Sequence, residues 1–234
     1  MSGGSFEGSL AEGSLALPRA RRADATAGVG MAIFLGAVAM LFAALFFAYA
    51  VMRAQAPAWP PAGQTPLPRG ALGLNTLVLL AASLALRGAR AAAGRGAEAV
   101  ARRRSLSALA LGVGFLVAQI VVWRALVRAG AGPASGIYGS VFFAISGFHA
   151  LHVVGGIAAL ALLVLVPGRV ARGASSVAGA SPAASTQRAP GPQASVVDAP
   201  SVSGASARRL GLCALYWDFV LAVWLVFYAV ACLR

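Results

Sequence analysis

Long apolar runs separated by polar connections dominate the chain. Five of them suit a hydrocarbon core of about 30 Å, which a helix crosses in about 20 residues. Their approximate bounds are 28–52, 72–87, 106–126, 138–166 and 210–233. The second run is the shortest, and its neighbours on either side could extend it. The pattern predicts an all-α integral membrane bundle of five transmembrane helices.

The composition agrees with a membrane protein. Hydrophobic residues make up 59% of the 234 residues, charged residues make up 11%, and the mean hydropathy is +0.81. A soluble domain could not cover so much apolar surface with so few charges. The net charge of +13 comes from arginines that lie between the apolar runs and not along one face. This distribution argues against a nucleic-acid-binding protein and is typical of orientation signals.

The arginines also predict the topology. We number the connections between successive spans from one to four. Fourteen arginines lie before the first span and in the second and fourth connections. The other five lie in the first and third connections and at the C-terminus. Basic residues concentrate on the cytoplasmic side of membrane proteins. We therefore expect a cytoplasmic N-terminus and, with an odd number of spans, a C-terminus outside.

The segments outside the spans divide the chain further. Residues 1–27 are rich in Gly and Ser and lack the pattern of a secretion signal, so we expect a flexible cytoplasmic tail. Residues 28–172 hold the first four spans, and residues 208–234 hold the fifth. Residues 173–207 have few large apolar side chains to offset the entropy of ordering. We predict a disordered cytoplasmic connection there.

Two histidines, His149 and His152, lie three residues apart inside the fourth span. Residues at this spacing share one helix face, so they cannot ligate a haem from both sides. A catalytic zinc typically takes three protein ligands, and Asp218 is the one buried candidate for the third. A metal site is therefore the minor alternative. We favour neutral, hydrogen-bonded imidazoles that hold this helix against its neighbours.

Asp218 follows Tyr216 and Trp217 in the last span. It lies about 13 Å along the helix from the start of that span, deep enough to need a partner. One interpretation is a group that handles protons or orders lipid. The other, which we favour, is an acid paired with a histidine across a helix interface.

Other polar residues point to helix contacts or lipid contacts. Gln119 and Asn75 lie within spans, where an amide that bridges helices contributes about 0.6–2 kcal/mol. Arg169 and Arg172 follow the fourth span and suit lipid phosphates, although orientation signals explain them equally well. The sequence contains no nucleophile elbow, phosphate loop or paired carboxylates. We therefore expect no catalytic residue, metal or cofactor in this chain itself.

Several stretches together resemble one family. The segment YGSVFFAISGFHALHVVGGI, residues 138–157, resembles the signature of subunit III of haem–copper terminal oxidases. Four more stretches match the family in the same order: residues 30–53, residues 67–87 around the Asn-Thr pair, GFLVAQIVVWRAL, and ALYWDFVLAVWLVFYAV.

The resemblance implies a function and a set of partners. It implies a non-catalytic subunit of a proton-pumping cytochrome c oxidase, in the cytoplasmic membrane of a bacterial-type cell. Such a subunit packs on subunit I near subunit II, holds structural phospholipid, and supports proton uptake and stability during turnover. Haem and copper are then expected in the partner subunits. His149 and His152 match the family's structural histidines.

The chain departs from the family at four positions. Val38 and Val122 stand where the family has glutamate, Asp218 replaces a histidine, and Leu221 replaces an aspartate. Because Val38 has no carboxylate, we expect carbodiimide, which modifies carboxyl groups, not to react with the chain at that site. The lost carboxylates also keep open an alternative, the related accessory protein of nitric oxide reductase. A transporter is disfavoured because few ionisable groups lie in the spans and no inverted repeat is present.

Overall fold

All the regular secondary structure of the described residues is helical. The computed structural model describes residues 5–58, 66–165 and 202–232, with side chains for 26–58, 66–165 and 207–231. Over these residues it contains α1 (Ser5–Gln55), α2 (Arg69–Gly94), α3 (Glu98–Arg128), α4 (Ile137–Leu165) and α6 (Val202–Cys232). Each of the five includes a stretch long and apolar enough to cross a membrane. The prediction of an all-α, five-helix membrane protein is confirmed.

The chain divides into two units, Met1–Ala48 and Tyr49–Arg234. The first unit contains most of α1, where the rings of Phe42 and Phe46 lie one helical turn apart with centroids separated by 6.3 Å. The helix begins at Ser5, within the segment predicted to be a flexible tail. Ala, Leu, Glu and Arg in this segment favour helix.

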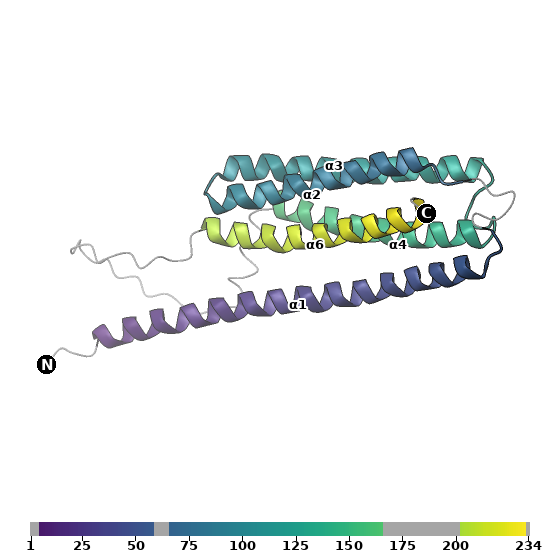
Figure 1. The fold of residues 1–234 in the computed structure, drawn as a ribbon. Helices are drawn as coiled ribbons and strands as arrows, with labels where there is room; N and C mark the ends of the chain where they lie inside the picture. The colour runs from purple at the N-terminus through teal and green to yellow at the C-terminus, as the bar shows by residue number, and fades with distance from the viewer. Residues whose placement is uncertain (1–4, 59–65, 166–201, 233–234) are drawn as a thin grey trace. The chain divides into compact units, whose positions relative to one another are not determined.

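In the second unit, four helices form a bundle. Helix α2 packs against α3 and α6, and α4 packs against the same two helices. Figure 1 shows these four helices running alongside one another, with α2 and α3 joined as a hairpin. Each helix therefore has two neighbours, and the side chains that face the middle form one shared core.

Two glycines end α2 and α3 in the same way. At the end of α2, the Gly96 N–H donates to the Ala93 carbonyl and the Ala97 N–H donates to the Ala92 carbonyl. After α3, the Gly130 N–H donates to the Val127 carbonyl and the Ala131 N–H donates to the Leu126 carbonyl. Both glycines have positive φ, at +73° and +78°, a conformation that is costly for other residues. These are Schellman motifs, and the first leaves only three residues between the end of α2 and the start of α3.

Two helices run beyond their predicted spans. Helix α2 continues to Gly94 and so includes Arg90, which lies beyond the predicted span 72–87. The alanines from position 89 to 93 favour helix and explain the extension. Helix α6 begins at Val202 and covers the end of the segment predicted to be disordered. The rest of that prediction, with Arg169 and Arg172, lies outside the described residues.

The bundle has a mainly apolar core that encloses a few polar side chains, and its outer surface is also apolar. Among the described residues, buried polar side chains include Asn75, Ser83, Ser105, Gln119, Ser146 and His149. Large apolar side chains such as Leu74, Leu77 and Leu151 are more than 60% exposed. Lipid tails are as apolar as leucine, so an apolar outer surface suits a bilayer, and buried polar groups can hold helices together.

Candidate functional site

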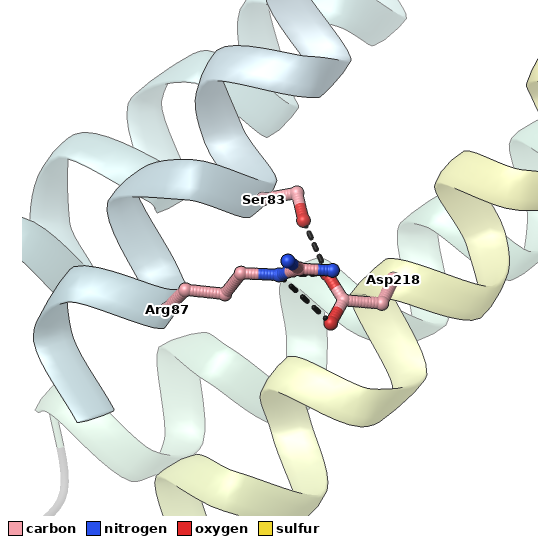
Figure 2. A network of polar contacts seen from close by, with 3 residues as sticks. All are labelled: Ser83, Arg87 and Asp218. Atoms are coloured by element: carbon pink, nitrogen blue, oxygen red, sulfur yellow. Dashed lines mark hydrogen bonds and ion pairs between the residues drawn. The ribbon is translucent and has the colours of Figure 1, made fainter. Parts of the chain in front are cut away.

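Asp218 lies at the interface between α6 and α2. Its carboxylate accepts hydrogen bonds from the Ser83 hydroxyl and from Arg87. The Arg87 Nε atom lies 3.0 Å from both carboxylate oxygens. Figure 2 shows the Ser83 and Arg87 side chains reaching across from α2 to the carboxylate on α6. The three groups form a polar link that joins the two helices.

The partner of Asp218 differs from the favoured prediction. We expected a histidine, but the structure supplies an arginine and a serine. Ser83 and Arg87 are four residues apart, so they project from the same face of α2. Arg87 is 60% exposed and Asp218 is 28% exposed, which places the ion pair at the rim of the bundle and Ser83 behind it.

His149 lies in the middle of an aromatic cluster, formed by Phe115 of α3, His149 of α4, and Trp224 and Phe227 of α6. The imidazole centroid lies 4.8 Å from Trp224 and 5.7 Å from Phe115, which meets it edge to face. Trp224 in turn lies 5.0 Å from Phe115 and 5.4 Å from Phe227. His149 is 1% exposed. Three helices therefore meet around this ring.

His152 lies in a different environment from His149. It is half-buried, and its Nδ1 atom lies 2.7 Å from the Phe148 carbonyl of the same helix. The carbonyl of His152 accepts a hydrogen bond of 2.7 Å from the Tyr216 hydroxyl of α6. Because the Tyr216 hydroxyl of α6 bonds to the backbone of His152, this residue contributes its carbonyl to the interface between α4 and α6.

Two further hydrogen bonds cross between helices in the buried core. The Asn75 side-chain amide of α2 donates to the Gln119 carbonyl oxygen of α3 over 2.9 Å. The Trp224 indole N–H of α6 donates to the Thr76 hydroxyl of α2, also over 2.9 Å. The sequence indicated Asn75 and Gln119 separately, and the structure brings them together.

Trp217 packs in a slot made by two glycines. It is 1% exposed. A Cβ atom added to Gly112 of α3 would lie 2.5 Å from Trp217 Cη2, and one added to Gly156 of α4 would lie 3.3 Å from Trp217 Cε2. Only glycine fits these positions without a shift of the indole. Trp217 of α6 therefore packs against both α3 and α4.

The three candidate metal ligands lie in separate environments. His149 lies in the aromatic cluster, His152 is directed to its own helix, and Asp218 is bonded to Ser83 and Arg87. Within the part of the chain that the structure describes, no group of three or more His, Cys, Asp or Glu side chains could hold a metal ion.

Sequence reasoning missed two arginines. Arg87 and Arg53 were counted as orientation signals, but Arg87 binds Asp218 and Arg53 Nη1 donates to the Val230 carbonyl over 3.2 Å. The spacing of Ser83 and Arg87 was a signal for the first contact. No local pattern indicates the second contact, because its partner is a backbone carbonyl 177 positions away.

Of the three departures from the family pattern within the second unit, two lie in buried apolar sites. Val122 is 6% exposed and Leu221 is 7% exposed. An aliphatic side chain at such a site needs no polar partner, whereas a carboxylate would need one. The substitutions are therefore compatible with the surrounding bundle.

The five apolar helices and the polar helix interfaces define a multi-pass membrane protein. The sequence model of the family "Cytochrome c oxidase subunit III" matches residues 11–169, more than half of the chain. The chain belongs to the cytochrome c oxidase subunit III family.

Relatives with this name support the assignment. The probable cytochrome c oxidase subunit 3 of Nocardia farcinica is 38% identical over 138 residues, which cover 58% of this chain and 68% of the relative. The probable subunit 3 of Mycobacterium tuberculosis is 37% identical over 146 residues, or 60% and 69% of the two chains. The subunit 3 of Synechocystis is 30% identical over 199 residues, or 85% and 72%.

Proposed function

We propose that the chain is the non-catalytic subunit III of a proton-pumping haem–copper oxidase in aerobic respiration. The observation that carries the proposal is the match of residues 11–169 to the subunit III family. In this proposal the chain packs on subunit I near subunit II, in a cytoplasmic membrane. Its N-terminus is cytoplasmic, its C-terminus is outside, and haem and copper belong to the partner subunits.

The contacts of the polar side chains support a structural role. Asp218 is bonded to Arg87, Asn75 to Gln119, and Trp224 to Thr76, each across a helix interface. Polar groups paired in this way stabilise helix packing in a membrane. A bundle held together by such pairs gives subunit I a rigid surface to pack against.

The proposed support of proton uptake is indirect. Valines replace glutamates at positions 38 and 122, and the Asp218 carboxylate is already bonded to Arg87 and Ser83. We infer that the chain assists proton uptake and turnover stability by holding subunit I and its structural phospholipids in place. Its own carboxylates do not relay protons in this proposal.

The test is a pull-down of the tagged chain from native membranes in mild detergent, analysed by mass spectrometry and a reduced-minus-oxidised spectrum. We expect a histidine-rich subunit I, a subunit with a copper-A site and an a-type haem signal. A nitric oxide reductase large subunit with a b- and c-type spectrum would contradict the proposal in favour of the alternative. Recovery of the chain without any haem protein would contradict both.

A further inference from the structure

The buried amides of Asn75 and Gln119 use only half of their polar atoms on each other. Each residue is 1% exposed. One hydrogen bond of 2.9 Å, from Asn75 Nδ2 to Gln119 Oε1, joins them across α2 and α3. The other two polar atoms, Asn75 Oδ1 and Gln119 Nε2, are also buried and make no hydrogen bond within the described residues. One acceptor and one N–H donor group are therefore unused inside the bundle.

The position of the two amides makes this arrangement costly. Asn75 lies within the apolar stretch Arg69–Gly94, and Gln119 lies within Glu98–Arg128. Bulk water is not available to polar groups at membrane depth, and a buried polar atom without a hydrogen bond destabilises a fold. In folded proteins nearly all such atoms have a partner, which is either another protein group or an ordered water. We therefore expect both atoms to have one.

The polar side chains nearest in sequence cannot donate to the unused acceptor. Thr76, next to Asn75, gives its one hydroxyl proton to a backbone carbonyl of its own helix over 2.9 Å. Trp123, one turn beyond Gln119, donates its indole N–H to the Ser146 hydroxyl over 3.1 Å. Both protons are committed to these bonds, so neither reaches Asn75 Oδ1.

The chemistry of the two unused atoms selects the kind of ligand. A cation would be attracted to Asn75 Oδ1 and repelled by the Gln119 N–H group, and an anion would meet the reverse. If both amides were turned over, their mutual bond would persist and one donor and one acceptor would again be left. Water both donates and accepts, and buried waters bind to polar groups that otherwise lack a partner.

We propose that one water molecule is bound between α2 and α3, donating to Asn75 Oδ1 and accepting from Gln119 Nε2. The water closes a ring of three hydrogen bonds whose third member is the bond of 2.9 Å between the amides. The site goes beyond the proposed function, because it belongs to this chain alone and needs no partner subunit. The competing arrangement is dry, with the two amides joined by two direct hydrogen bonds.

The experiment is electron cryo-microscopy of the particles that contain the chain, purified from native membranes, at a resolution that shows ordered waters. In the wild type we expect a density peak within hydrogen-bond distance of Asn75 Oδ1 and Gln119 Nε2. Gln119→Leu removes the donor and should abolish the peak. Ser83→Ala is the control, because it removes another buried polar group of α2 that bonds to α6, and it should retain the peak.

A second measurement needs no variant. In the full chain labelled with ¹⁵N-glutamine, a long-lived bound water should give a nuclear Overhauser effect between water and the Gln119 side-chain amide. Two direct hydrogen bonds between the amides, with neither a density peak nor this effect, would overturn the inference. A peak that persists in Gln119→Leu would also overturn it, because the water would then not depend on the Gln119 donor.

Discussion

At the scale of single residues, the structure separates two histidines that the sequence presents as a pair. His149 contacts aromatic rings from α3 and α6, whereas His152 is half-buried and directed to a carbonyl of its own helix. A side chain held by ring contacts on two helices fixes three helices together. We therefore assign the structural role mainly to His149.

The histidines give the first prediction. His149→Ala should lower stability by about 2–4 kcal/mol, because it leaves a cavity between Phe115 and Trp224. His152→Ala should lower it by less than about 1 kcal/mol, because it removes one local hydrogen bond. The measurement is unfolding of the purified chain by titration with SDS. Equal losses of stability in the two variants would contradict the interpretation. So would a metal ion that is bound to the wild-type chain and missing from either variant.

The contact between Ser83 and Asp218 gives the second prediction. Ser83→Ala removes a buried donor to a charged carboxylate and should cost about 1–3 kcal/mol. Ser107→Ala is the matched control, since that hydroxyl is exposed and donates to the Arg103 carbonyl of its own helix. Its effect should stay within about 0.5 kcal/mol. The measurement is the melting temperature of each variant in the same detergent. Equal melting temperatures would contradict the stabilising role assigned to Ser83.

At the scale of elements, close helix packing depends on which glycines face a neighbour. Gly112 and Gly114 lie in the same helix, but a Cβ atom at Gly112 would meet Trp217 and one at Gly114 would meet nothing within 4 Å. The sequence shows only that small residues are abundant. The structure identifies Gly112 as the one of these two glycines that faces Trp217 of α6.

These glycines give the third prediction. Gly112→Ala should destabilise the bundle by about 1–3 kcal/mol through overpacking. Gly114→Ala should be neutral or stabilising by up to about 1 kcal/mol, because alanine favours helix. Melting temperatures of the two variants test this contrast. Trp217→Phe should reduce the cost of Gly112→Ala, and a double-mutant cycle without coupling would show that the indole is not the cause.

At the scale of the whole molecule, five spans require the two termini to lie on opposite sides of the membrane. The distribution of arginines predicts which side each one takes. We expect alkaline phosphatase fused after Gly130 or at the C-terminus to be active, because both positions should lie outside. A fluorescent protein fused at the N-terminus should fluoresce inside the cell, and a reporter after Arg95 should behave as cytoplasmic. The reverse set of signals would contradict the orientation.

Most of the fold could be predicted from the sequence, for a physical reason. In a bilayer every backbone polar group must be paired within the chain, so a long apolar run has few alternatives to a helix. The five spans therefore follow from the apolar pattern, and their locations were right. The ends were less accurate, as at α2, because alanine and arginine can continue a helix after the apolar run has stopped.

The candidate site was only partly predictable. Polar side chains inside spans are costly, so Asn75, Gln119, His149 and Asp218 could be recognised as residues that need partners. Arg87 was not recognised, although it lies four residues from Ser83, because an arginine near the end of a span also serves as an orientation signal. Its role depends on how α2 and α6 face each other.

The sequence by itself determined the number of helices, the membrane environment and the family resemblance, because local composition and ordered motifs carry this information. Only the tertiary structure decided which polar groups meet: Asp218 with Arg87, Asn75 with Gln119, and Arg53 with a carbonyl near the other end of the chain. Helix packing sets these pairs through the rotation and depth of each helix relative to its neighbours. Those quantities depend on the side chains of several helices together, so no single segment specifies them.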